Sequence, residues 1–164
     1  MIDKILFTLK KNHYTWSPFF LRLIIGFGFI THGWAKLSRG PEGFGKLLTQ
    51  IHIPFPEAIA WICTMLELSG GVAIVLGVFV SIAAIPLIGI MLVAMFSIHI
   101  HYGFSSVKTI GLTPQGPVFG PIGYEINLLY IVGLVSLILT GAGIFSVDAW
   151  LARAKNKSIK EPAC

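Results

Sequence analysis

Glu67 is the strongest candidate for a chemical role, because this carboxylate interrupts the apolar stretch WICTMLELSGGVAIVL at residues 61–76. An ionised side chain inside a bilayer costs at least about 2.5–3.5 kcal/mol, so it requires a partner or a wet cavity. Two roles satisfy this requirement: ligand binding or proton handling, and an ion pair that only holds helices together. At helical spacing the residues that share its face are small or polar, namely Cys63, Thr64, Gly70 and Gly71.

Two cations, Arg22 and Lys36, fall on one face of another apolar run. The rest of that face consists of Gly26, Phe29 and Gly33, with His32 at its margin. A charged face within an apolar run must look into the protein. Three partners are compatible with Arg22: the headgroup layer, a carboxylate such as Glu67, and a group at the end of the fourth apolar run.

His99 and Glu125 stand at the margins of two further apolar runs. The face of Glu125 carries Leu129, Gly133, Ser136 and Thr140, which we interpret as a second acidic, small-residue stripe. His99 and His101 form an H-x-H pair, which raises a metal interpretation. Residues two apart on a helix point about 200° from each other, so both rings cannot hold one ion while the helix continues. We therefore expect no metal site.

Composition shows what kind of protein must hold these residues. Hydrophobic residues make up 55% of the 164-residue chain, charged residues 12%, and the mean hydropathy is +0.82. So much apolar surface can only face lipid, which indicates an integral membrane protein. The 12 Lys and Arg exceed the 7 Asp and Glu, but they gather at the chain ends. That distribution indicates membrane topology and no nucleic-acid partner.

The apolar runs predict an all-α fold, an integral membrane four-helix bundle with short interfacial helices at the termini. We expect a single domain over residues 1–164, with spans at about residues 18–37, 57–76, 82–101 and 124–142. Ser17 and Pro18 are typical of a cap and first turn, and are expected to begin the first span. The connector at residues 38–56 contains a segment, FGKLLTQI, that suits a short interfacial helix covering the outer mouth. The connector at residues 102–123 is expected to lie against the bundle mouth.

Cofactor motifs are missing from the sequence. It contains no C-x-x-C-H for haem, no G-x-G-x-x-G after a strand for a flavin or nicotinamide nucleotide, and no metal motif. Cys63 and Cys164 are too far apart in sequence and membrane depth to form an obvious pair. Any redox group must therefore be held non-covalently.

Four segments resemble the DoxX family of bacterial and archaeal membrane proteins. They are RLIIGFGFITHGWAKL (residues 22–37), LELSGGVAIVLGV (66–78), YEINLLYI (124–131) and GAGIFSVDAWL (141–151). The resemblance implies a four-helix membrane protein. Some members of this family are subunits of thiosulfate:quinone oxidoreductase, and others are linked to quinone handling or oxidative stress. The family's recurring polar positions correspond here to Arg22, His32, Lys36, Glu67, His99, Glu125 and Asp148.

Three functions are compatible with these residues. The first is a membrane subunit of a quinone-linked oxidoreductase or of an oxidative-stress or sulfur redox complex, with a redox partner protein and a non-covalently bound quinone. In this hypothesis the proton carriers are Glu67, Glu125 and His99, and the quinone or ion-pair contacts are His32, Lys36 and Arg22. The second is a non-catalytic membrane scaffold that docks a partner, and the third is a conduit for protons or small solutes. Beyond membrane lipid, a second copy of the chain is a further candidate partner.

Antiparallel geometry predicts that five of these residues converge on one pocket in the outer half of the bundle. Spans one and three end at the outer surface, whereas spans two and four begin there. The predicted pocket contains His32, Lys36, Glu67, His99 and Glu125, with Glu67 roughly 15 Å down as its floor.

The distribution of cations generates a prediction of topology. The end segments carry Lys4, Lys10, Lys11, Arg153, Lys155, Lys157 and Lys160, against Arg39, Lys46 and Lys108 in the other connectors, with Lys36 at the boundary. The positive-inside rule therefore places both termini in the cytoplasm of a bacterial or archaeal cell, in a multi-pass protein of the cytoplasmic membrane. With cysteines at Ser158 and Thr113, an impermeant reagent on intact cells should label Thr113→Cys alone. Labelling of Ser158→Cys alone would reverse the orientation.

Overall fold

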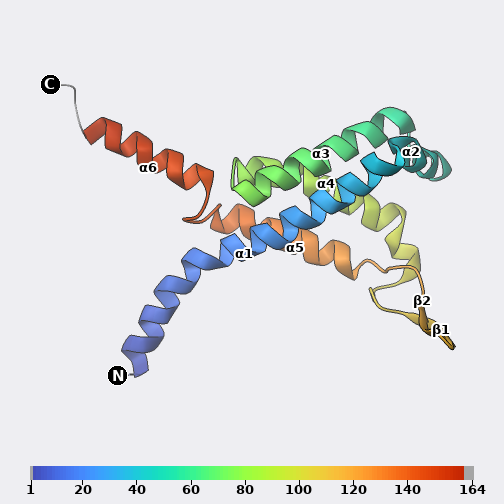
Figure 1. The fold of residues 1–164 in the computed structure, drawn as a ribbon, viewed down its shortest axis with the longest axis horizontal. Helices are drawn as coiled ribbons and strands as arrows, with labels where there is room; N and C mark the ends of the chain where they lie inside the picture. The colour runs from blue at the N-terminus through green and yellow to red at the C-terminus, as the bar shows by residue number, and fades with distance from the viewer. Residues whose placement is uncertain (1, 161–164) are drawn as a thin grey trace.

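The computed structural model describes residues 2–160, with side chains over residues 16–155. Within this range the chain is almost entirely helical and carries one small hairpin (Figure 1). The helices are α1 (Ile2–Arg39), α2 (Pro41–Gln50), α3 (Pro56–Leu76), α4 (Val80–Ser97), the 3-10 turn η1 (His99–Tyr102), α5 (Glu125–Thr140) and α6 (Val147–Lys160). The strands are β1 (Thr109–Thr113) and β2 (Gly116–Phe119). An all-α membrane four-helix bundle, formed by α1, α3, α4 and α5, confirms the predicted fold class.

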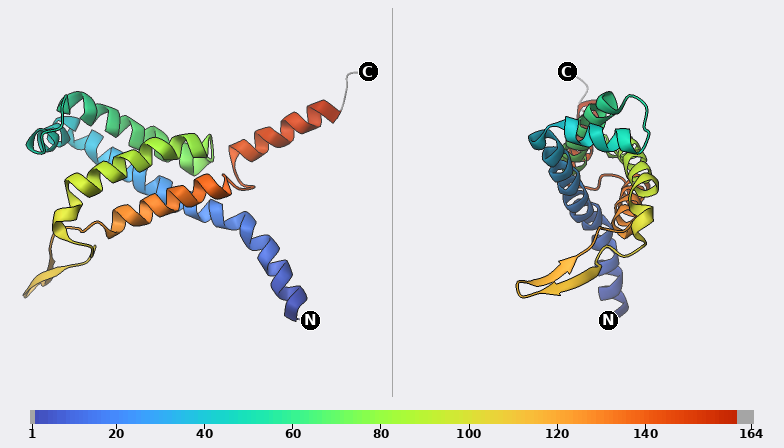
Figure 2. Two further views of the ribbon diagram at one scale, coloured as in Figure 1. Left: turned by 180° about the vertical axis from the view of Figure 1, so that it is seen from behind. Right: turned by 90° about the vertical axis from the view of Figure 1, so that its right-hand side faces the viewer.

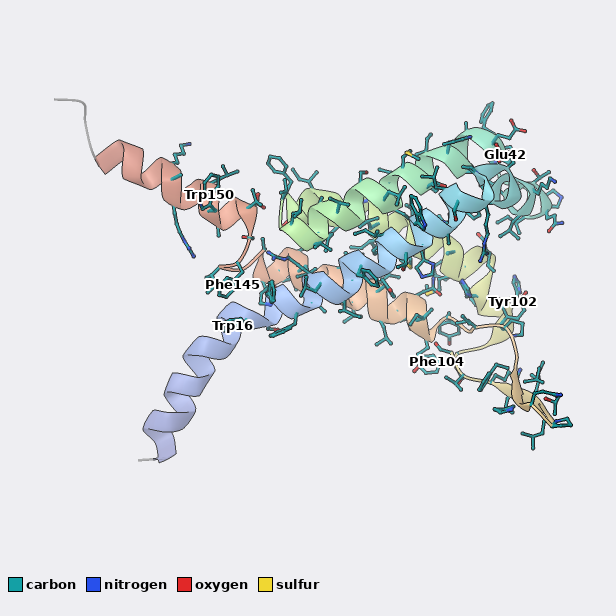
Figure 3. The ribbon with its side chains drawn as sticks, viewed as in Figure 1. Trp16, Glu42, Tyr102, Phe104, Phe145 and Trp150 are labelled. Atoms are coloured by element: carbon teal, nitrogen blue, oxygen red, sulfur yellow. The ribbon has the colours of Figure 1, made fainter. Side chains whose placement is uncertain are left out.

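The first helix does not begin at Pro18. α1 runs unbroken from Ile2 to Arg39 with Pro18 inside it, so the expected cap at Ser17 and the separate N-terminal interfacial helix are wrong. A proline inside a helix removes one hydrogen bond and crowds the preceding turn, which bends the helix. The ribbon changes direction near Trp16, and the N-terminal part leads away from the bundle (Figures 1 and 3).

Three described helices, Trp16–Arg39 of α1, Pro56–Leu76 and Val80–Ser97, are long and apolar enough to cross a membrane. The fourth apolar helix, Glu125–Thr140, has only 16 residues. Large apolar side chains such as Ile24, Ile85 and Leu139 are 67%, 65% and 81% exposed. A soluble protein does not present such a belt, whereas a bilayer covers it.

α4 ends earlier than the predicted third span. It stops at Ser97, and η1 follows after Ile98, so His99 and His101 lie in a 3-10 turn after the helix. The preceding helix, α3, ends at Gly77, which adopts a left-handed conformation (φ 73°). α4 begins three residues later. This tight turn makes α3 and α4 antiparallel neighbours, as the sequence predicted.

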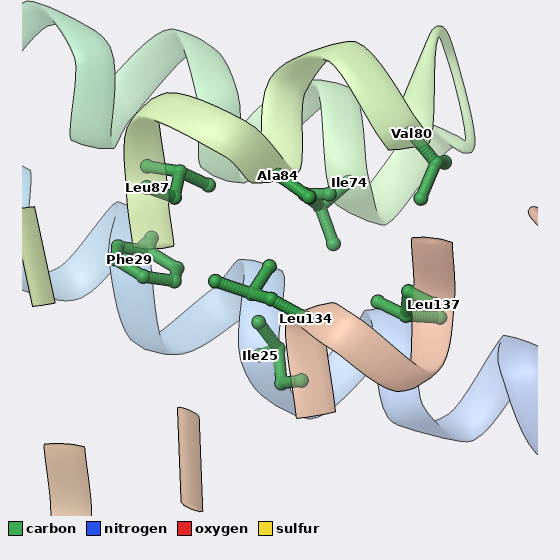
Figure 4. Close-up of a cluster of buried hydrophobic side chains, with 8 residues drawn as sticks. All are labelled: Ile25, Phe29, Ile74, Val80, Ala84, Leu87, Leu134 and Leu137. Atoms are coloured by element: carbon green, nitrogen blue, oxygen red, sulfur yellow. The ribbon is translucent and has the colours of Figure 1, made fainter. Parts of the chain in front are cut away.

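The bundle is built around a close contact between α1 and α3. A Cβ added to Gly71 would lie 2.8 Å from the backbone oxygen of Gly26 and 2.9 Å from the nitrogen of Ile30. Without side chains at Gly26 and Gly71 the two backbones approach closely, which is how helices associate in lipid. The remaining core connects all four helices (Figure 4) and consists of Ile25, Phe29, Ile74, Val80, Ala84, Leu87, Leu134 and Leu137.

The two long connectors behave differently. The first forms α2, as predicted, and packs against α3. The second does not lie against the bundle mouth as expected. Its strands β1 and β2 form an antiparallel hairpin, nearly all of it exposed, that projects sideways from the bundle (Figure 2, right).

The contact between α1 and α3 generates a test of the packing. Gly71→Ala should destabilise the protein by about 1–3 kcal/mol, because the new methyl group meets backbone atoms that cannot move aside. The matched control is Gly89→Ala in α4, where a Cβ would find no atom within 4 Å. Its effect should be neutral or slightly stabilising. Unfolding in detergent measures both, and equal effects would contradict the close contact.

Candidate functional site

Lys36 and Glu67 form an ion pair between α1 and α3. The Lys36 Nζ donates to Glu67 Oε1 at 2.6 Å. The Glu67 side chain is 3% exposed and that of Lys36 22%, so the carboxylate is buried while the ammonium reaches the surface of the bundle. The inward faces predicted for both helices are confirmed here, because Arg22, Phe29, Thr64 and Glu67 are all buried.

The surroundings of Glu67 leave part of the carboxylate unsatisfied. Its Oε2 is buried and makes no hydrogen bond to any described residue. Thr64, one turn earlier on the same face, donates its hydroxyl to the carbonyl of Ala60 instead. Glu67 therefore retains an acceptor that is free for a ligand or a proton.

Helix α2 covers the exposed side of this pair. The Lys36 Nζ lies 4.2 Å from the ring centroid of Phe44, within the range of a cation–π interaction. α2 follows α1 after Gly40, whose backbone has a positive φ of 83°. A glycine adopts this conformation without strain, so the chain can turn sharply and bring Phe44 back over Lys36.

Asn127 is a buried polar residue that the sequence analysis did not single out. It is 2% exposed, and its Nδ2 donates to the Met91 carbonyl at 3.4 Å, while its Oδ1 has no partner among the described residues. Of the predicted stripe of α5, Gly133 is buried, but Leu129 is 61% exposed and the buried polar residue of this helix is Asn127. The sequence does contain a pattern that predicts this inward face, because Asn127, Leu134 and Leu137 recur at helical spacing.

Asn127 lies at about the same depth as Glu67. The rings of Phe29 on α1 and Tyr130 on α5 are 5.3 Å apart, and the two helices run in opposite directions (Figure 1). One turn further along α1, a Cβ on Gly33 would lie 3.2 Å from the Cβ of Glu67. One turn back along α5 stands Asn127. Two buried acceptors without partners, Glu67 Oε2 and Asn127 Oδ1, thus share one level of the bundle.

His99 and Glu125 contact the second connector and not the ion pair. The His99 Nδ1 lies 3.0 Å from the Ile122 carbonyl. Glu125 Oε2 accepts a hydrogen bond from the backbone N–H of Ser106 at 2.9 Å. His32, at the margin of the α1 face, is exposed. Of the five residues predicted to share a pocket, the structure joins only Lys36 and Glu67 by a direct contact.

Arg22 lies at the other end of the bundle. Its guanidinium donates to the carbonyls of Ala142 and Phe145, in the turn between α5 and α6. Of its three predicted partners, the end of the fourth apolar run is therefore confirmed. Gly77 packs against this guanidinium, and a side chain there would collide with Arg22. Gly77 also accepts the backbone N–H of Asp148 at 3.1 Å, so Arg22 stands where two turns meet.

A cavity of about 480 Å³ opens beside these two turns. It is lined by Phe79, Val80, Ser81, Ile82, Gly141, Ala142, Gly143, Ser146, Asp148 and Ala149. The hydroxyl of Ser146 is already used, since it donates to the Gly143 carbonyl at 2.6 Å. The lining contains none of the six site residues predicted from the sequence.

Arg22→Ala should destabilise the protein by about 3 kcal/mol, because it removes two charge-assisted hydrogen bonds and leaves two carbonyls without a donor. The matched control is Arg153→Ala. Arg153 is exposed and reaches the Ile144 carbonyl at 3.3 Å, so its removal should change the free energy of unfolding by no more than about 0.5 kcal/mol. Denaturant unfolding in detergent compares the two variants. Equal losses would show that Arg22 does not hold the turns.

Comparison with known proteins places the chain in a family. The family model DoxX matches residues 17–100, which include α2, α3, α4 and the part of α1 from residue 17 onward. Two relatives from Haemophilus influenzae, both described as uncharacterized proteins, are each 28% identical to the chain. The first match covers 79% of this chain and 86% of the relative, and the second covers 84% of each. No solved structure matches the chain. The chain belongs to the DoxX family of membrane proteins.

Proposed function

We propose that this protein is the membrane subunit of a quinone-linked oxidoreductase, and that the Lys36–Glu67 pair holds the quinone headgroup. The observation that carries the proposal is the asymmetry of the pair. Its cation is partly exposed and its carboxylate is buried with one free oxygen. An ion pair that served only to join two helices would gain from satisfying both oxygens, because an unpaired acceptor in a low-dielectric interior is costly.

Lys36 supplies the hydrogen-bond donor in this proposal. An ammonium carries three N–H donors, and among the described residues only Glu67 accepts one of them. A quinone carbonyl is an acceptor that matches the remaining donors. Phe44 over the ammonium offers an aromatic surface on which a flat ring stacks.

Glu67 supplies the proton route. Reduction of a quinone to a quinol takes up two electrons and two protons, so the site needs a group that gives up a proton and is recharged. The ionised Glu67 takes up a proton at Oε2 and passes it to the reduced quinone, once for each of the two protons, and Asn127 Oδ1 at the same depth accepts a hydrogen bond from a quinol hydroxyl. The electrons come from a reduced centre in a partner protein. We assign no proton-carrying role to His99 and Glu125, because the connector backbone engages both.

A scaffold function is the second candidate, and a specific observation favours it. Arg22, His99 and Glu125 all bind backbone groups of turns or connectors in this same chain. In that case Lys36–Glu67 also acts only as a specificity contact between α1 and α3. A proton conduit would use the same buried acceptors without binding a quinone.

Two variants separate these functions. Glu67→Gln keeps the shape of the side chain and removes its charge and proton, so the purified protein should retain its quinone and lose quinone-linked dye reduction with its partner. Adding Lys36→Met to this variant avoids a stranded buried charge and removes the donor, so bound quinone should fall about tenfold or more. The measurements are extraction and chromatography of ubiquinone and menaquinone from the purified protein, and dye reduction in reconstituted membranes.

The matched control is Glu57→Gln, an exposed carboxylate at the start of the same helix, α3. It should leave both quinone content and dye reduction unchanged. A wild-type protein that carries no quinone when purified from its native membrane would contradict the proposal and favour the scaffold. Quinone retained by the double variant would show that Lys36 is not the donor.

A further inference from the structure

The β1–β2 hairpin presents different residues on its two faces, and the face of Leu112 is apolar. Its strands are antiparallel, with Leu112 opposite Pro117 and Gly111 opposite Val118. Opposed residues point to the same side and successive residues alternate. The face of Leu112 therefore carries Pro117 and Phe119. Ile110 lies in the bulge between Thr109 and Gly111 and points to the other face, since a Cβ on Gly120 would lie 2.9 Å from its Cγ2. That opposite face holds Ile110 and Val118 together with Thr113, Gly111 and Gly116.

No described part of the chain covers the apolar face. Leu112 is 83% exposed and Phe119 59%. In the view along the bundle the hairpin extends to one side of the helices and does not fold back onto them (Figure 2, right). The side chains at its tip stand clear of the ribbon of every helix (Figure 3).

The base of the hairpin is fixed at the level where two apolar helices end. α4 stops at Ser97 just before it, and α5 begins at Glu125 just after it. Four hydrogen bonds hold this base: Tyr124 N–H to Gly103, Glu125 N–H to Phe104, Gly123 N–H to Ser105, and Ser106 N–H to the Glu125 carboxylate. The rings of Phe104 and Tyr124 meet edge to face, with centroids 5.5 Å apart. Aromatic rings at helix ends are typical of the membrane–water boundary.

We propose that this hairpin lies in the interfacial layer of the bilayer, with the face of Leu112, Pro117 and Phe119 turned toward the acyl chains. The hairpin leaves the bundle sideways at the membrane boundary, so its apolar face meets lipid with no change of fold. The opposite face and the free strand edges remain among headgroups and water, which satisfy the backbone groups that hydrocarbon cannot.

A protein partner fits this face less well. Stable protein interfaces use roughly 20–30 residues on each side, whereas the apolar face consists of Leu112, Pro117 and Phe119. Charge offers no alternative basis for docking, because Lys108 is the only charged residue between Val107 and Gly123. A bilayer requires neither a large matched area nor complementary charges. The inference is independent of the proposed quinone site, and it leaves α2 as the segment that covers Lys36 and Glu67.

Spin labelling of the full-length protein tests the proposal. In a Cys63→Ser, Cys164→Ser background, Leu112→Cys and Thr113→Cys carry the same nitroxide on opposite faces of one strand. The protein is reconstituted in nanodiscs of phosphatidylcholine and phosphatidylglycerol. Relaxation by oxygen, which concentrates in acyl chains, is compared with relaxation by a water-soluble nickel chelate. We expect the oxygen-to-nickel ratio to be several-fold higher at Leu112→Cys than at Thr113→Cys.

Equal ratios at the two sites, with free access of nickel to both, would overturn the proposal, because they would place both faces in water. A second copy of the chain is distinguished by dilution. If two hairpins pair, the spectrum at Leu112→Cys is broadened by spin–spin coupling, and the broadening disappears when labelled protein is mixed with excess unlabelled protein. That result would also overturn the lipid assignment.

Discussion

The close approach of α1 and α3 is the constraint on which the rest of the structure depends. Gly26 and Gly71 remove the side chains that would keep the two backbones apart, and only at this spacing does the Lys36 ammonium reach Glu67 at 2.6 Å. A carboxylate in an apolar helix is tolerable in a bilayer only when such a partner is in place. The small-residue contact and the ion pair therefore support each other.

The two ends of the bundle use polar groups in different ways. At the end where the chain turns from α3 into α4, the Arg22 guanidinium donates hydrogen bonds to backbone carbonyls. These bonds connect the α5–α6 turn to the rest of the molecule. At the opposite end, Glu125 and His99 anchor the second connector. Between them Glu67 and Asn127 keep acceptors that no described residue uses. Contacts with turns and connectors account for the polar groups at the ends, whereas Glu67 and Asn127 carry the buried acceptors on which the proposed function rests.

The two connectors at that end have separate tasks in this view. α2 packs on α3 and places Phe44 over Lys36, so it covers the ion pair on that side. The second connector turns away as a hairpin whose exposed apolar face belongs with the lipid. A membrane protein can present such a face because its solvent changes from water to hydrocarbon over a short distance at the boundary.

The sequence by itself determined the class of protein, the approximate spans, the family resemblance and the inward faces of α1 and α3. Composition and helical periodicity can be read from short stretches of the chain, and an ionised residue in an apolar run must face the interior of the protein. The sequence did not determine which polar residues meet. Pro18 permits either a helix start or a bend, and the connector of residues 102–123 has no periodicity that separates a lid from a projecting hairpin. Asn127 was not predicted as a buried polar residue, because an uncharged amide indicates an inward face less clearly than the neighbouring carboxylate of Glu125. Only tertiary packing decided that Lys36 reaches Glu67, that Arg22 binds carbonyls, and that His99 and Glu125 bind the connector, since each pairing joins residues far apart in the chain.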